Sequence, residues 1–136
     1  MSLQFLLDTD TCVYWLRGRE PIRERVTGVG LATLGISVMT LAELRYGAAC
    51  SARPEANQQA VDAFSDAIIV IGIDAAIARA FGDIKAALRA QGTLLEDSDL
   101  LIGATARTYG LTLVTNNSEH FRRVPGLTLE NWSLPT

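Results

Sequence analysis

Residues 5–10 read Phe-Leu-Leu-Asp-Thr-Asp, a short apolar run that ends on a carboxylate. Bulky apolar residues between turn-forming segments are typical of a strand that is buried on both faces, as in a parallel α/β sheet. Ligands of such sheets bind just beyond the carboxyl ends of the strands, where Asp8 would stand. The same aspartate would also cap a helix over residues 9–16, so this stretch alone leaves its role open between capping and chemistry.

The length of 136 residues and the apolar fraction of 49% predict a single domain, residues 1–136, with a sizeable core. No apolar run approaches the ~20 residues that a membrane-spanning helix needs, so we expect no membrane association. Residues 2–4 carry no basic residue and Asp8 soon interrupts the apolar run, so we expect no secretory signal and a cytoplasmic protein. The slightly positive mean hydropathy indicates apolar surface that is available for oligomerisation.

The formal net charge of −3 argues against a protein that holds nucleic acid by bulk electrostatic attraction, which requires a basic face. Local basic patches are still compatible with this charge. All basic residues except Lys85 are arginines, and two groups stand out, in residues 17–25 and at 122–123. The planar guanidinium group suits phosphate, although ordinary surface ion pairs explain the same bias.

Short apolar stretches alternate with amphipathic ones along the whole chain. Strands are expected at residues 5–7, 34–38, 68–71, 111–115 and 127–130. Helices are expected at residues 9–16, 21–28, 41–50, 55–67, 75–90 and 100–106. This alternation predicts a three-layer α/β/α fold with a central, mostly parallel sheet of four to five strands.

Acidic residues recur at the starts of the predicted helices. Residues 40–43, Thr-Leu-Ala-Glu, have the form of a capping box, which predicts that Glu43 lies in the first turn of a helix. Asp97 and Asp99 precede another helix, as Asp8 does. Helix capping explains each residue taken alone. If these turns lie along one edge of the sheet, however, the carboxylates converge there.

Convergence of carboxylates has an electrostatic cost. Two of them about 4 Å apart repel by about 4 kcal/mol at an effective dielectric near 20, so they must share protons or bind a cation. Helix N-termini favour the ionised form, which indicates a bound cation. Oxygen ligands without His or Cys favour Mg²⁺, with Mn²⁺ as a substitute, over zinc. Such a site suits hydrolysis of phosphodiester bonds by an activated water.

Four ordered stretches carry a resemblance to a known family: Asp8-Thr9 after a buried strand, and residues 40–47, 99–106 and 113–117. Together with residues 124–127 and 130–132, they resemble the PIN-domain ribonucleases, and more narrowly the VapC toxins of bacterial toxin–antitoxin pairs. The likeness covers nearly the whole chain. It implies a PIN domain that acts as a Mg²⁺-dependent endoribonuclease on structured, tRNA-like RNA. It also implies a VapB-like antitoxin and a homodimer that assembles with this antitoxin into a larger complex.

The resemblance also implies roles for individual residues. Asp8 and Asp99 would be the principal metal ligands, and Glu43 would complete the acidic triad, directly or through water. Asn117 stands in the segment where many family members have a fourth acid, and it joins the predicted catalytic set. This departure leaves open whether the site holds one ion or two.

Neighbouring residues extend this set. His120 precedes Phe121 where some of these toxins have Glu, and Glu119 is a candidate substitute for the missing acid. Asp10 replaces the Asn that is common after the Asp-Thr pair and could accept a hydrogen bond beside the metal ligands. Asp97 has no fixed counterpart in the family pattern, so Asp99 is the preferred ligand.

Three rival readings remain at this stage. A haloacid-dehalogenase-type phosphatase would use Asp8 as its nucleophile, but its pattern requires Thr where Cys12 stands and a lysine beside the phosphate. A response-regulator receiver also gathers acids at strand ends and needs a strand-end lysine, whereas Lys85 lies within a predicted amphipathic helix. The third alternative is a catalytically silent PIN fold that only binds a partner.

Overall fold

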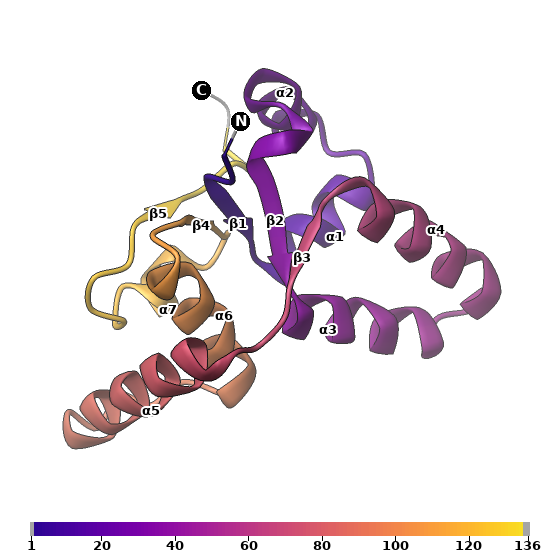
Figure 1. Cartoon of the computed structure of the whole chain (residues 1–136). Helices are drawn as coiled ribbons and strands as arrows, with labels where there is room; N and C mark the ends of the chain where they lie inside the picture. Colours follow the sequence, from indigo (N-terminus) through magenta and orange to yellow (C-terminus); the bar gives the residue numbers. More distant parts are fainter. Residues whose placement is uncertain (1, 135–136) are drawn as a thin grey trace.

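The apolar stretch at residues 5–7 forms the central strand of a five-stranded sheet in a computed structural model that describes residues 2–134 (Figure 1). The strand order is β3-β2-β1-β4-β5, and every neighbouring pair is parallel. The strands are β1 (Phe5–Leu7), β2 (Leu34–Ser37), β3 (Ile69–Ile71), β4 (Thr112–Val114) and β5 (Leu129–Glu130). The predicted sheet of four to five mostly parallel strands is therefore confirmed.

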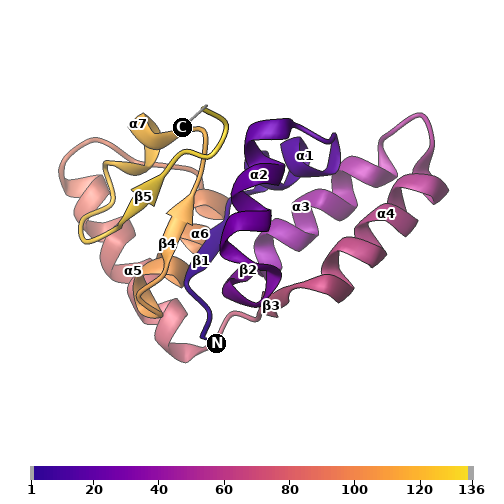
Figure 2. The ribbon, with the colours of Figure 1, turned by 90° about the horizontal axis from the view of Figure 1, so that it is seen from above.

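Helices connect the strands and cover both faces of the sheet. They are α1 (Thr9–Leu16), α2 (Glu20–Val29), the 3₁₀ turn η1 (Leu31–Thr33), α3 (Val38–Ala49), α4 (Pro54–Ala67), α5 (Ala75–Ala90), α6 (Asp97–Thr108) and α7 (Ser118–Phe121). Seen from above, helices α1 to α4 lie on one side of β1 and β2, and α5 to α7 lie on the other (Figure 2). This arrangement is the predicted three-layer fold.

Side chains of β1 alternate between the two layers, as they do in any strand. Leu6 is fully buried and belongs to a core built from α5, α6 and α7. Leu7 is fully buried in a second core, which α1 to α4 share with Trp132. The indole of Trp132 packs edge-to-face on Phe5, with ring centroids 5.1 Å apart. The sheet thus separates two cores and fixes where its carboxyl edge lies.

Helix α3 begins earlier than the sequence pattern predicts. Ser37 ends β2 and caps the helix, because its hydroxyl accepts a hydrogen bond from the Met39 N–H at 3.0 Å. Thr40 is buried inside the helix, and Glu43 lies in its second turn. The predicted capping box at residues 40–43 is therefore wrong. The chain passes directly from strand to helix at Ser37, which is itself a favoured cap residue.

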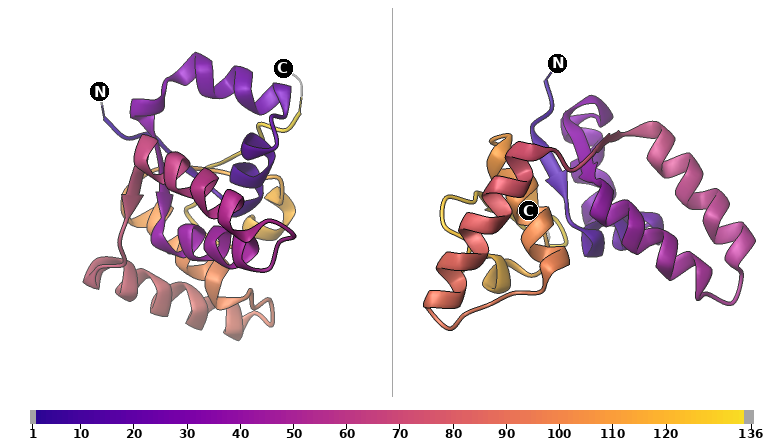
Figure 3. Two further views of the ribbon diagram at one scale, coloured as in Figure 1. Left: turned by 90° about the vertical axis from the view of Figure 1, so that its right-hand side faces the viewer. Right: turned by 60° about the horizontal axis from the view of Figure 1, so that its bottom comes forward.

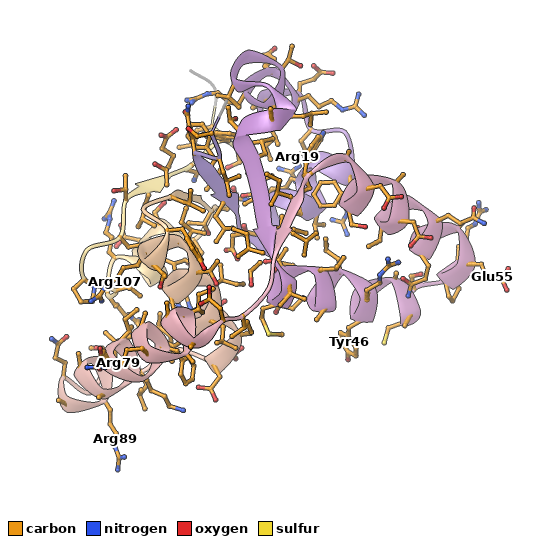
Figure 4. The ribbon with its side chains drawn as sticks, in the orientation of Figure 1. Arg19, Tyr46, Glu55, Arg79, Arg89 and Arg107 are labelled. Atoms are coloured by element: carbon orange, nitrogen blue, oxygen red, sulfur yellow. The ribbon has the colours of Figure 1, made fainter. Side chains whose placement is uncertain are left out.

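The helices after β2 and β3 form two hairpins, α3 with α4 and α5 with α6, whose members pack against each other. These hairpins extend away from each other on opposite sides of the sheet (Figure 3). Tyr46 and Glu55 project from the first hairpin, and Arg79 and Arg89 from the second (Figure 4). The longest described helix, α5, has 16 residues. No helix within residues 2–134 combines the length and the hydropathy needed to cross a bilayer.

Candidate active site

Four acidic residues gather at the carboxyl edge of the sheet, where β1, β2 and β4 end. We call this group the acidic site, and its members are Asp8, Asp10, Glu43 and Asp99. Asp8 follows β1 directly and extends its pairing with β4, because its backbone N–H donates to the Val114 carbonyl at 2.9 Å. The side chain of Asp8 also caps α1 by accepting the Thr9 N–H at 2.8 Å. The capping interpretation of Asp8 is therefore confirmed, and its role in chemistry stays a prediction.

Asp8 is the most deeply buried member of the acidic site, with 6% of its surface exposed. Its second oxygen, Oδ2, accepts a hydrogen bond from the Thr115 hydroxyl at 2.8 Å. Burial, followed by the negative charge of Asp10 and then that of Asp99, raises the pKa of Asp8 to about 7 despite these hydrogen bonds. The Asp8 carboxylate is therefore held in a negative field that a cation would relieve.

Asp10 lies in the first turn of α1, beside Asp8. Its Oδ2 accepts the backbone N–H of Asn116 at 3.2 Å, and its Oδ1 accepts the Thr11 hydroxyl at 3.3 Å. Burial raises the pKa of Asp10, while these hydrogen bonds act against that rise. Asp10 thus joins α1 to the segment after β4, which agrees with the predicted role of an acceptor beside the ligands.

Glu43 reaches the acidic site from α3 through a threonine. The hydroxyl of Thr9 donates to Glu43 Oε1 at 2.7 Å, and the hydroxyl oxygens of Thr9 and Thr40 lie 3.2 Å apart. Because Thr9 also donates its backbone N–H to Asp8, it connects the two acids. Glu43 therefore belongs to the site although it lies one helical turn deeper than predicted.

Asp99 and Asp97, two residues apart on α6, have different partners. Asp99 Oδ2 lies 2.7 Å from His120 Nε2 on α7, and both side chains are about a quarter exposed, 26% for Asp99 and 25% for His120. Asp97 instead bonds Lys85 on α5 at 2.8 Å and is 62% exposed. The negative charge of Asp99 also contributes to raising the pKa of Asp8, so Asp99 lies near the acidic site, whereas Asp97 takes part in a surface ion pair.

Asn117 and Glu119 lie at the margin of this arrangement. Asn117 is exposed, and its backbone N–H donates to Thr115 Oγ1 at 3.0 Å. Through Thr115 it is one hydrogen bond removed from Asp8. Glu119 is 84% exposed and pairs with Arg122. His120, which follows Glu119, is the side chain of this segment that contacts an acid of the site.

The acidic site has no lysine or arginine as an ion-pair partner in the described part of the chain. Among the six ion pairs found within residues 2–134, none joins a lysine or arginine to Asp8, Asp10, Glu43 or Asp99. The buried Oδ1 of Asn116, on the residue whose N–H reaches Asp10, has no hydrogen-bond partner in that part of the chain either. Carboxylates without an ion-pair partner, and a buried amide oxygen without a hydrogen-bond partner on the adjoining segment, suit a hard divalent cation, which takes oxygen ligands.

The protein alone does not enclose such an ion. In the described part of the chain, no three His, Cys, Asp or Glu side chains converge closely enough to form a ready cage. A small divalent ion such as Mg²⁺ usually keeps several waters and binds through one or two carboxylates. The donor set therefore fits a largely hydrated ion and does not fit a fully protein-ligated one.

Two threonines that hold the site escaped sequence analysis as functional residues. Thr9 positions Asp8 and Glu43, and Thr115 is fully buried and bonds Asp8. The signal for Thr115 was its place at the end of a strand that neighbours β1. The signal for Thr9 was its adjacency to Asp8. Neither position reveals its hydrogen-bond partner, because the partners lie 34 and 107 residues away.

A pocket of about 350 Å³ opens beside the acidic site, between α1, α3 and α4. Thr9 and Glu43 are among its lining residues, as are Leu16, Arg17 and Val61. Arg17 is exposed and is not part of any ion pair within residues 2–134. The same pocket is therefore lined by an acid of the site, by Arg17 and by apolar side chains.

Comparison with known proteins gives consistent matches over this whole arrangement. The PIN-domain family profile matches residues 5–127. The "tRNA(fMet)-specific endonuclease VapC" of Shigella flexneri is 40% identical over 132 residues, which cover 96% of this chain and 99% of that protein. The "Ribonuclease VapC2" of Rickettsia felis is 37% identical over 131 residues, which cover 94% and 97%.

Solved structures agree with these sequence matches. The crystal structure of DNA-bound VapBC from Salmonella typhimurium contains a chain that matches with a TM-score of 0.91 at 39% identity. The match covers 96% of this chain and 98% of that one. The likeness therefore extends over the sheet, both helical layers and the segments that carry the acidic site.

Proposed function

The chain belongs to the PIN-domain family, within its VapC branch, and from this premise we propose that it is a metal-dependent endoribonuclease serving as the toxin of a toxin–antitoxin pair. The observation that carries the proposal is that Thr9 links Asp8 to Glu43 at one edge of the sheet, where the negative charge of Asp99 also contributes to raising the pKa of Asp8. The names of the Shigella and Rickettsia relatives, an endonuclease and a ribonuclease, support the reaction.

We assign Asp8 and Asp99 as the residues that hold a divalent cation, Mg²⁺ or Mn²⁺, with Glu43 completing the set directly or through water. The chemistry that such an ion supplies when bound is polarisation of a phosphate oxygen and a lowered pKa of water. The support is electrostatic. Asp99 contributes to raising the pKa of Asp8, and no lysine or arginine of residues 2–134 neutralises either acid.

The chain's own residues hold these acids in place. Asp8 is fixed through both oxygens, by the Thr9 N–H and the Thr115 hydroxyl, so it cannot turn away from the edge of the sheet. Glu43 is held through Oε1 by Thr9, which leaves its other oxygen to accept a proton from an attacking water. Fixing the acids in advance lowers the reorganisation needed during the reaction.

The net charge of the chain is −3, so the protein as a whole does not attract RNA. RNA binding therefore requires local positive charge near the acids. Arg17 supplies it in the pocket that Thr9 and Glu43 also line. A guanidinium group binds a phosphate through two parallel hydrogen bonds, which suits the RNA backbone. We therefore assign Arg17 a role in holding RNA beside the acidic site. Transfer RNA is the proposed substrate class, on the strength of the Shigella relative's name.

The partner of this toxin is proposed to be a VapB-like antitoxin, because the matching solved chain from Salmonella comes from a VapBC complex. The chain is also proposed to form a homodimer that assembles with antitoxin into a larger complex. Exposed apolar side chains are available for such contacts, among them Leu16, Leu31 and Ile73, exposed by 40%, 44% and 45%.

The phosphatase and receiver alternatives lose their support in the structure. Both require a lysine beside Asp8, but Lys85, the single lysine of the chain, lies on α5 and bonds Asp97. The alternative of a catalytically silent PIN fold requires an acidic site that cannot support cleavage of RNA. The fixed geometry of Asp8 and Glu43 argues against that alternative.

The test of this function is cleavage of total transfer RNA by purified, antitoxin-free protein. We expect discrete fragments in Mg²⁺, none in excess chelator, and recovery when Mg²⁺ or Mn²⁺ is added back in excess. Intact RNA under all metal conditions, from protein shown to be folded by circular dichroism, would contradict the proposal. It would favour the silent binding module.

A further inference from the structure

His120 is the one nitrogen-bearing side chain that contacts an acid of the acidic site within residues 2–134. It comes from α7, and its Nε2 lies 2.7 Å from Asp99 Oδ2. The two side chains are 25% and 26% exposed, whereas Asp8 is 6% exposed. The Asp99–His120 pair is therefore more accessible from solvent than Asp8.

The position of the imidazole is set by its surroundings. The ring packs edge-to-face on Phe121, with centroids 5.4 Å apart, and Phe121 is buried at 1% exposure. The backbone N–H of His120 donates to the Asn117 carbonyl at 3.1 Å. Because both the ring and its backbone are held, the approach of Nε2 to Asp99 follows from the packing of α7.

The spacing of the two atoms suits a pair of metal ligands. Neighbouring donors on an octahedral ion with bonds of about 2.1 Å lie about 3 Å apart. Nε2 and Oδ2 lie 2.7 Å apart, which is close to this spacing. The nearby Lys85–Asp97 pair, at 2.8 Å, differs in kind because a lysine ammonium offers no acceptor.

We propose that His120 is a nitrogen ligand of the divalent ion held at Asp99, and that the site therefore prefers Mn²⁺ to Mg²⁺. Mg²⁺ is a hard cation that takes oxygen ligands, whereas transition-metal ions accept imidazole nitrogen more readily. The inference rests on the proposed metal site. It adds to that site an identified ligand and a choice of metal.

The test uses the fact that the chain contains a single histidine. Tag-free protein is loaded with Mn²⁺ alone and examined by pulsed electron paramagnetic resonance. We expect a ¹⁴N coupling typical of imidazole, which changes to a ¹⁵N coupling when the protein is labelled with ¹⁵N-histidine. In His120→Gln the coupling disappears and Mn²⁺ affinity falls by at least about tenfold, more than Mg²⁺ affinity measured by competition.

Glu119→Gln is the matched control, because Glu119 neighbours His120 on α7 but pairs with Arg122 at the surface. This variant should keep both the coupling and the affinity. His120→Asn serves as a second variant if His120→Gln fails to fold, as judged by circular dichroism.

The remaining outcomes separate this inference from the proposed function. Mn²⁺ that binds wild type and is lost in Asp99→Asn, but shows no histidine coupling, overturns the inference and leaves the nuclease site standing. A drop in Mn²⁺ affinity in His120→Gln, without any coupling in wild type, also overturns it, because His120 would then act only by orienting Asp99. Absence of Mn²⁺ binding in wild type overturns both.

Discussion

The Thr9 hydroxyl donates a 2.7 Å hydrogen bond to Glu43 Oε1, and this bond joins the first turn of α1 to the second turn of α3. The backbone N–H of Thr9 simultaneously donates a hydrogen bond to Asp8 Oδ1 at 2.8 Å. One threonine thus sets the position of two acids that are 35 residues apart in the sequence.

Removing this hydroxyl tests its role in positioning. We expect Thr9→Val to lower kcat for RNA cleavage by about 10- to 100-fold, because Glu43 loses the donor that orients it. Thr9→Ser keeps the donor and should stay close to wild type. Steady-state kinetics with a fluorescent RNA, paired with thermal melts, separates positioning from folding. A valine variant with unchanged kcat would show that Glu43 needs no such support.

The raised pKa of Asp8 predicts how stability depends on pH in the absence of metal. The pKa rises from 3.8 to about 7, so the folded protein binds a proton more tightly than the unfolded chain between these values. The free energy of unfolding should therefore fall as pH rises from about 4 to 7, by on the order of 3 kcal/mol, and then level off.

Urea denaturation in chelator at several pH values measures this dependence. Asp8→Asn removes the titrating group and should flatten the curve over the same range. An unchanged slope in Asp8→Asn would assign the pH dependence to other groups, with Asp10 as the first candidate because its pKa is also raised.

The sequence predicted most of the sheet because each strand is a compact apolar run bounded by turn residues, as in residues 5–7 and 69–71. It misplaced the start of α3 because Ser37 and Thr40 are both good cap residues three positions apart. The choice between these two cap residues depends on where β2 ends, which is at Ser37. It missed α7, since four residues are too few to show a helical period.

The sequence was sufficient to predict which acidic residues form the candidate site, but not the contacts that hold them. Asp8 and Asp99 could be selected because carboxylates at helix starts in a parallel α/β sheet share one edge. Glu43 was selected with a capping box that the structure does not form. Their supporting contacts could not be selected. The Thr9–Glu43 and His120–Asp99 contacts depend on how α1 packs against α3 and α7 against α6, which no local pattern encodes.

Glycine at position 35 tests the packing of β2 against its neighbours. A Cβ there would meet the Leu3 side chain at 3.0 Å and the Ile69 carbonyl oxygen at 3.1 Å. Gly35→Ala should therefore destabilise the protein by about 1–3 kcal/mol. Gly82→Ala is the matched control, because its Cβ would meet nothing within 4 Å in the exposed middle of α5. That variant should gain about 0.5–1 kcal/mol, and a reversed order in urea denaturation would contradict this packing.

Arg17 tests how RNA reaches the acids. We expect Arg17→Ala to raise KM for RNA about tenfold with a smaller change in kcat, since it removes a phosphate contact beside the reacting group. Arg89→Ala makes the same change of charge on the distant end of α5 and should leave both constants near wild type (Figure 4). Equal effects of the two variants would reduce the role of Arg17 to general electrostatic attraction.

The central claim, that acids from distant segments act together in one metal-dependent site, is tested most directly by RNA cleavage in Mg²⁺ with neutral variants of each acid. Asp8→Asn and Asp99→Asn should each lower cleavage by at least about 1,000-fold while circular dichroism shows an intact fold. Asp97→Asn, two residues away on α6 but paired with Lys85, should keep wild-type activity. Full activity of folded Asp8→Asn or Asp99→Asn would contradict the account.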